Sequence, residues 1–148
     1  MTGSPVVVDA SIALRWLLPD PLSNACWVLF DRIVQRNDPI TVPTLWMYEV
    51  VSGLTKAVYL GSVTPDEARK GLDQIYQFRA NLVDADDLIS QRAFEWTLRL
   101  NRAAAYDSYY LALAETLNGT LWTADRRLYN STRAANIEWV YWVEDARD

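Results

Sequence analysis

Residues 6–19 read VVVDASIALRWLLP, a pattern that predicts a short strand, then an acid, then a helix. The three valines are typical of a strand that is buried on both faces of a sheet. We expect Ser11 to cap the helix and Pro19 to end it. Asp9 therefore lies at the end of a buried strand, where a carboxylate is costly unless a positive charge compensates it.

Three further acids share the property of lying inside or directly after an apolar segment. They are Glu49 within residues 46–54, Asp107 within 106–117, and Asp125 directly after 121–124. No lysine or histidine stands beside any of the four acids in the sequence. We therefore expect a divalent metal ion to compensate their charge.

The remaining pattern alternates strands with helices. Strands are expected at 6–8, 40–42, 81–83, 121–124 and 137–141, with helices at 12–17, 25–33, 46–57, 65–78, 88–100 and 107–117. Asp125 is expected to open a further turn or helix. Such alternation predicts an α/β fold, a three-layer α/β/α sandwich with a mainly parallel central sheet. We expect one domain over residues 1–148. Asp84, Asp86 and Asp87 precede a predicted helix and are interpreted as helix caps rather than metal ligands.

The composition excludes several classes of chemistry. The chain of 148 residues has no histidine and one cysteine, which removes histidine acid–base catalysis, internal disulfides and cysteine-built zinc sites. No basic leader or long apolar stretch is present, so we expect a soluble, cytoplasmic protein without a membrane segment. Without the four acids, 15 Asp and Glu face 14 Lys and Arg, so the net charge of −5 does not exclude a phosphate substrate.

The expected fold brings the four acids together. Asp9 and Asp125 follow strands, and ligands of parallel sheets bind beyond the carboxyl ends of the strands. Glu49 and Asp107 complete a ring of carboxylates if their helices flank that crevice. Four carboxylates raise one another's pKa values, so such a ring is expected to hold Mg²⁺ or Mn²⁺, which can activate water and stabilise a leaving oxygen.

Two small hydroxyl residues stand next to the acids at the strand ends. Ser11 and Thr123 could each hydrogen-bond a carboxylate or a metal-bound water. Ser11 could equally serve as a helix cap, and Thr123 as an ordinary β-branched strand residue. Both interpretations remain open.

Residues 8–19 resemble the opening of PIN-domain proteins of the VapC toxin type. Three further blocks, 43–54, 105–114 and 121–128, resemble the acidic blocks of that family in order and spacing. The resemblance implies a metal-dependent endoribonuclease, the toxin component of a toxin-antitoxin pair, which cleaves RNA by metal-activated water. It implies catalytic, metal-binding roles for Asp9, Glu49, Asp107 and Asp125, with Ser11 and Thr123 in support and Mg²⁺ or Mn²⁺ as cofactor.

The same resemblance implies an RNA substrate, a cognate antitoxin protein and a homodimer. Arg15, Arg126 and Arg127 are candidates for contacts to phosphate or to a partner, although a solvated helix face would also explain them. The seven tryptophans are interpreted mainly as core residues, with stacking on RNA bases as the alternative. Trp139 and Trp142 remain open between the two.

Two other functions compete with the nuclease. A phosphatase of the haloacid dehalogenase type also has an aspartate after its first strand, but its second aspartate would fall on Ser11, and no lysine stands near the later acids. A catalytically silent PIN-like module could use the acidic pocket to bind a partner's arginine. The sequence does not specify the RNA target, the antitoxin or the number of metal ions.

Overall fold

A five-stranded parallel sheet forms the centre of the fold in the computed structural model, which describes residues 3–147. The strands are β1 (Val6–Val8), β2 (Thr41–Pro43), β3 (Asn81–Val83), β4 (Thr120–Thr123) and β5 (Val140–Trp142). One ladder has the order β1-β4-β5 and the other pairs β2 with β3, and all pairings between these strands are parallel. A single parallel bridge between Val6 and Ile40 joins the two ladders. The order across the sheet is therefore β5-β4-β1-β2-β3.

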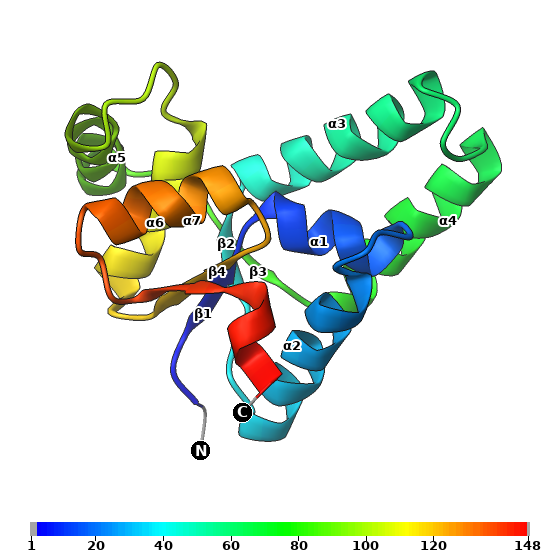
Figure 1. Cartoon of the computed structure of the whole chain (residues 1–148), viewed down its shortest axis with the longest axis horizontal. Coiled ribbons are helices and arrows are strands. Elements are labelled where there is room, and N and C mark those ends of the chain that lie inside the picture. Colours follow the sequence, from blue (N-terminus) through cyan, green and yellow to red (C-terminus); the bar gives the residue numbers. More distant parts are fainter. Residues whose placement is uncertain (1–2, 148) are drawn as a thin grey trace.

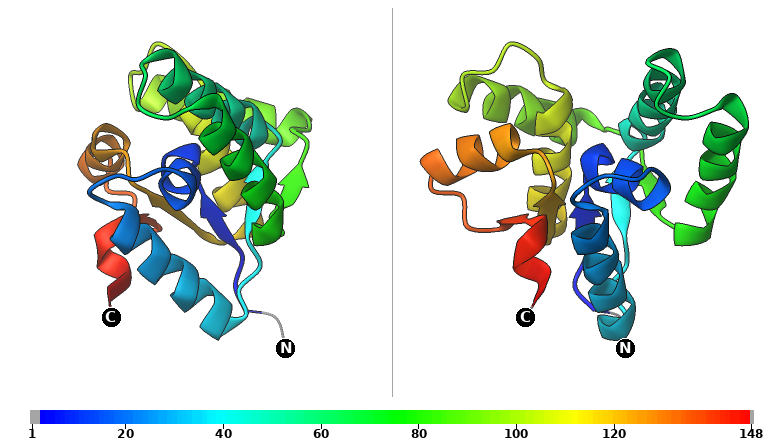
Figure 2. Two further views of the ribbon diagram at one scale, coloured as in Figure 1. Left: turned by 90° about the vertical axis from the view of Figure 1, so that its right-hand side faces the viewer. Right: turned by 45° about the vertical axis from the view of Figure 1, so that its right-hand side comes forward.

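Helices cover both faces of this sheet. The described residues form α1 (Ala10–Leu17), α2 (Ser23–Arg36), α3 (Leu45–Tyr59), α4 (Pro65–Ile75), α5 (Asp87–Arg99), α6 (Tyr106–Leu117) and α7 (Arg126–Ala134), with short 3₁₀ turns η1 (Tyr76–Phe78) and η2 (Val143–Arg147). Figure 2 shows α6 on one side of the sheet and α1 and α2 on the other. The predicted three-layer α/β/α sandwich is thus confirmed.

The outer helices pack on this central arrangement. Helix α5 packs on α6, whereas α3 and α4 form a pair that extends away from the sheet (Figure 1). Within residues 3–147, no helix combines the length and the apolar composition that crossing a membrane requires.

Helix α6 is the central helix of the core. All five residues from 110 to 114 are buried, because the helix lies between the sheet and α5. A helix that is buried on every side loses the usual polar face, which explains the sequence YLALA at these positions. The first turn of α6 carries Asp107 and reaches the edge of the sheet where β1 and β4 end.

The prediction that Ser11 caps the first helix is wrong. The cap is Asp9, whose side chain accepts a hydrogen bond of 3.3 Å from the backbone N–H of Ile12. Aspartate and serine both favour this position, and the extended backbone of Asp9 decides between them. Ser11 lies inside α1, which leaves its hydroxyl free to serve another purpose.

The last strand begins later than predicted. Ile137 belongs to the turn that ends α7, because its N–H donates to the carbonyl of Thr132 at 3.0 Å and the preceding Asn136 is left-handed, with φ of 60°. The strand starts only at Val140. In contrast, the predicted cap Asp86 is confirmed, since its side chain accepts the N–H of Ile89 at 2.8 Å.

Most tryptophans pack in the core, as expected. Trp16, Trp46 and Trp96 are buried. Trp142 is also buried, and Trp139 packs edge-on against Trp96 with 5.9 Å between ring centroids. Of the two tryptophans that the sequence left open, Trp142 therefore belongs to the core and Trp139 is partly buried against it.

We expect the substitution Leu111→Ala to lower the free energy of unfolding by about 3 kcal/mol, because it leaves a cavity beside the central helix. Leu111 is fully buried, whereas Leu98 on α5 is 60% exposed. The matched change Leu98→Ala should therefore cost less than about 1 kcal/mol. Urea denaturation of both variants measures the difference, and equal losses would contradict the central role of α6.

Candidate active site

The four predicted acids line one cleft of about 370 Å³. Asp9 follows β1 and Asp125 closely follows β4, and these strands are neighbours in the sheet. Glu49 comes from α3, and Asp107 comes from the first turn of α6. The carboxyl ends of two parallel strands and two flanking helices thus bring together acids that are up to 116 positions apart in the chain.

Asp9 is the most deeply buried of these acids, with 4% of its surface exposed. The hydroxyls of Ser11 and Thr123 each donate a hydrogen bond to a different oxygen of its carboxylate. The backbone N–H of Ile12 is a third donor. Three donors therefore hold this carboxylate in one orientation without a charged partner.

The two hydroxyls also connect the ends of neighbouring strands. The Ser11 oxygen accepts the N–H of Ala124 at 2.9 Å, and the Thr123 oxygen accepts the N–H of Asp125 at 2.9 Å. Each hydroxyl thus donates to Asp9 and accepts from the backbone that follows β4. This network fixes the position of Asp125 relative to Asp9.

Burial raises the pKa of Asp9 from 3.8 to about 7. The hydrogen bonds from Ser11 and Thr123 lower this pKa, while the nearby negative charge of Asp107 raises it. The carboxyl group of Asp9 is therefore only partly ionised near neutral pH. A cation in the cleft would favour the ionised form.

Glu49 is held by a tyrosine of the core. The Tyr110 hydroxyl donates to Glu49 Oε1 at 2.5 Å, and Tyr110 is fully buried on α6. Burial raises the pKa of Glu49, the hydrogen bond from Tyr110 lowers it, and Asp107 raises it further. Burial and Glu49 also raise the pKa of Tyr110, so its hydroxyl remains a donor. The amino-acid sequence did not predict this contact between Tyr110 and Glu49.

Asp107 has a positive partner that the sequence analysis missed. Arg102 Nη2 donates to Asp107 Oδ2 at 2.8 Å, and the same guanidinium lies 3.4 Å from the Ser131 hydroxyl. Burial raises the pKa of Asp107, and Arg102 lowers it. The expectation that a metal ion alone compensates the acids therefore needs correction here. The position of Arg102, shortly before the helix that carries Asp107, was the sequence feature that could have predicted this ion pair.

Asp125 combines a local role with its place in the cleft. It caps α7 by accepting the N–H groups of Arg127 at 3.0 Å and Leu128 at 3.4 Å. Its negative charge also raises the pKa of Asp107. The capping bonds orient Asp125 and leave the carboxylate on the wall of the cleft.

Arg15 lies on the wall of the cleft, but its guanidinium is already engaged. Its Nε donates to Asp20 Oδ1 at 2.9 Å, and its Nη1 donates to the carbonyl of Ser11 at 2.8 Å. Both contacts tie it to its own helix and the turn that follows. Arg15 is therefore a weaker candidate for contact with phosphate.

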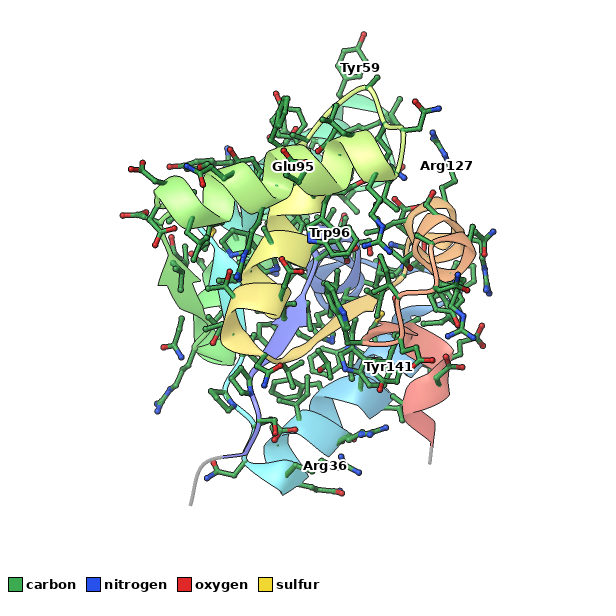
Figure 3. All side chains as sticks on the ribbon, turned by 90° about the vertical axis from the view of Figure 1, so that its left-hand side faces the viewer. Arg36, Tyr59, Glu95, Trp96, Arg127 and Tyr141 are labelled. Carbon is green, nitrogen blue, oxygen red and sulfur yellow. The ribbon has the colours of Figure 1, made fainter. Side chains whose placement is uncertain are left out.

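The other two predicted arginines differ in their surroundings. The Arg126 guanidinium lies over the ring of Trp142, 3.8 Å from its centroid. Arg127 is exposed, is near enough to lower the pKa of Asp107, and is labelled in Figure 3 on α7. Lys56, which the sequence analysis did not identify, also lines the cleft. Arg127 and Lys56 are therefore better placed than Arg15 and Arg126 to contact a phosphate group.

The side chains fit a hard divalent cation in chemistry, since all four are oxygen donors and burial raises the pKa of Asp9, Glu49 and Asp107. Among the described residues, however, no three acids are arranged to hold a metal ion as they stand. Glu49 is bonded to Tyr110 and Asp107 to Arg102. Binding would therefore require these side chains to turn toward the cleft.

The fold and the site together define a class of protein, a parallel α/β/α sandwich with an acidic pocket at the carboxyl edge of its sheet. A PIN domain family model matches residues 6–133. The chain is 32% identical to Ribonuclease VapC3 of Pyrobaculum aerophilum over 83% of this chain and 91% of the relative. It is 33% identical to Ribonuclease VapC9 of Mycobacterium tuberculosis over 87% and 92%. The chain therefore belongs to the PIN-domain family, in its VapC group.

A solved structure agrees with this fold. VapBC2 from Rickettsia felis, bound to a promoter DNA fragment, has a chain with a TM-score of 0.68 and 14% identity, which covers 93% of this chain and 98% of that one. The comparisons give no support to a phosphatase of the haloacid dehalogenase type or to a silent module.

The pKa of Asp9 predicts that the metal-free protein loses stability as the pH rises. Because the folded-state pKa of about 7 exceeds the unfolded value of 3.8, the folded protein keeps a proton that the unfolded chain releases between these values. The free energy of unfolding should fall by about 4 kcal/mol across this window through Asp9. Urea denaturation in EDTA at pH 5 and pH 8 covers about two pH units of this window and should show a fall of about 2.7 kcal/mol.

The isosteric variant Asp9→Asn carries no charge at this position, so its stability should depend less steeply on pH. Glu49 and Asp107, whose pKa values are also raised, leave a residual slope. An equal pH dependence of parent and variant would show that Asp9 does not titrate in this range.

Proposed function

We propose that this protein is an endoribonuclease that depends on Mg²⁺ or Mn²⁺ and acts in the cytoplasm as the toxin of a toxin-antitoxin pair. The observation that carries the proposal is the convergence of Asp9, Glu49, Asp107 and Asp125, from four separate elements, on one cleft. The VapC relatives named as ribonucleases support RNA as the substrate. Without histidine, these carboxylates are the groups suited to hydrolysis.

The four carboxylates would hold the metal. When bound, Mg²⁺ or Mn²⁺ supplies Lewis-acid polarisation of the phosphodiester and lowers the pKa of the attacking water. Asp9 is preorganised for this role because Ser11 and Thr123 fix both of its oxygens. These hydroxyls act through Asp9 and are positioning residues.

The cations at the cleft suit a phosphate backbone. Arg127 is exposed beside Asp107, and Lys56 lines the opposite side from α3. These positive charges would orient the scissile phosphate against the acids. Water attack on phosphorus with departure of the 3′ oxygen leaves a 5′-phosphate and a 3′-hydroxyl.

The proposal includes a cognate antitoxin and a homodimer. The VapBC2 structure from Rickettsia felis, which contains a chain of this fold, supports an antitoxin partner. The homodimer is proposed from the resemblance to the family. Asp107 pairs with the guanidinium of Arg102, and an arginine of the antitoxin could replace Arg102 in this contact. Phe94 on α5 is 59% exposed and offers apolar area for a second copy.

The first test of this function is RNA cleavage by the purified protein with Mn²⁺. Asp107→Asn and Asp125→Asn should each reduce the rate by about 100-fold or more, because each removes a negatively charged metal ligand while keeping its shape. Mapping of the 5′ ends of the fragments should find 5′-phosphates. Asp86→Asn is the matched control, since Asp86 caps α5 outside the cleft.

Parent activity in both cleft variants, or cleavage that persists in EDTA, would contradict the proposal. Loss of activity in Asp86→Asn as well would indicate a general effect of the substitution.

The second test concerns the ion pair in the cleft. Arg102→Gln should tighten Mn²⁺ binding by about two- to five-fold, because Arg102 competes with the cation for Asp107 and such partly exposed pairs are worth about 1 kcal/mol or less. Isothermal titration calorimetry measures the affinity directly. Arg99→Gln, on the exposed surface of α5, is the charge-matched control. Weaker Mn²⁺ binding in Arg102→Gln would mean that Arg102 supports the site instead.

A further inference from the structure

A second cavity, of about 650 Å³, lies between α2 and α7 over strands β4 and β5. It is larger than the acidic cleft and shares none of its lining residues. Its lining is distinguished by arginines and aromatic rings, which are Arg32, Arg36, Arg133, Trp122, Tyr129 and Tyr141. We refer to it as the arginine-aromatic cavity.

The aromatic rings form a stack with one accessible member. Tyr141 stacks on Trp122 with 4.9 Å between centroids and an interplanar angle of 21°. The guanidinium of Arg32 lies 5.2 Å from the centroid of Trp122. Trp122 is buried, with 4% of its surface exposed, but Tyr141 is 37% exposed. The phenol ring of Tyr141 is therefore a supported, flat surface on which another ring could stack.

The arginines of this cavity form no ion pair with a carboxylate in the part of the chain that the structure describes. None of the ion pairs among the described residues involves Arg32, Arg36 or Arg133. The cavity also contains two acids, Asp38 and Asp145, so its lining keeps an excess of positive charge in a chain whose net charge is −5. A guanidinium group without an ion-pair partner can bind two oxygens of a phosphate at once.

Strand β4 connects this cavity to the candidate active site. Trp122 faces the cavity, and its carbonyl accepts the N–H of Asp9 at 3.3 Å. The next residue, Thr123, donates to the carboxylate of Asp9. Figure 3 shows Arg36 on α2 and Tyr141 on β5 below the end of α7 that carries Arg127.

We propose that the arginine-aromatic cavity binds an unpaired nucleotide of RNA, with its base on Tyr141 and its phosphates on Arg32, Arg36 and Arg133. This inference rests on the proposed ribonuclease function and extends it to RNA beyond the cleaved bond. An acidic peptide would pair with the arginines but would leave the flat face of Tyr141 unused. Stacking and phosphate contact together are typical of proteins that bind single-stranded RNA.

Fluorescence anisotropy with a short, labelled single-stranded RNA tests the arginines in the full chain, in EDTA so that no cleavage occurs. The triple variant Arg32→Gln, Arg36→Gln, Arg133→Gln should bind about ten-fold or more weakly. The slope of log affinity against log salt should become shallower by about 2, because single-stranded RNA contributes about 0.7 per neutralised phosphate.

A charge-matched control removes three cations elsewhere. Arg69, Lys70 and Arg79 are exposed on α4 and in the turn after η1, and their change to Gln should leave the affinity within about two-fold and the slope nearly unchanged.

The stacking role is tested at one residue. Tyr141→Ser should weaken RNA binding by about ten-fold with the salt slope unchanged, and Tyr141→Phe should bind like the parent because the ring is kept. Thermal melting verifies that each variant is folded. If Tyr141→Ser does not fold, Tyr141→Leu replaces the ring by an apolar side chain and should weaken binding similarly.

Parent-like affinity and salt slope in the triple arginine variant would overturn the inference. So would unchanged RNA binding together with lost affinity for the cognate antitoxin, since the cavity would then be a protein-binding surface. These results leave the proposed function intact if the parent cleaves RNA with Mn²⁺. If the parent binds RNA through the cavity but cleaves none, the proposed function fails and the cavity remains an RNA site.

Discussion

The buried carboxylate of Asp9 is the constraint on which the rest of the site depends. An acid with almost no solvent contact destabilises the fold unless donors surround it, and here the donors come from both sides of the β1–β4 pair. Ser11 reaches it from α1, and Thr123 reaches it from the end of β4. Because both hydroxyls also accept backbone N–H groups, any shift of the two strands would break several hydrogen bonds together.

Two of the other acids, Glu49 and Asp107, each accept a hydrogen bond from a partner, and the two partners differ in charge. Glu49 has a neutral donor, Tyr110, and Asp107 has a charged one, Arg102. These contacts reduce the mutual repulsion of the acids, and both residues still line the cleft. The cleft nevertheless keeps an unfavourable concentration of negative charge, because four carboxylates line it. Substrate, cation and an arginine from a partner would all compete for the same oxygens.

Strand β4 serves two surfaces because side chains alternate along a strand. Thr123 faces the acidic cleft through its hydroxyl, and Trp122 lies in the arginine-aromatic cavity. The overall charge of the chain conceals this arrangement, since acids gather in one place and unpaired arginines in another. Net charge is therefore a poor guide to RNA binding here, and the local excess of charge is the relevant quantity.

Local patterns in the sequence predicted the α/β class, the order of its elements and the four acids, because buried strands and amphipathic helices are encoded by neighbouring residues. Choices between two suitable residues, such as Asp9 or Ser11 as the first cap, were not predictable, since the backbone angles decide them. The contact of Tyr110 with Glu49 and the meeting of α2 with α7 around Trp122 join distant segments. They depend on how helices rotate and pack against the sheet, which no local pattern encodes.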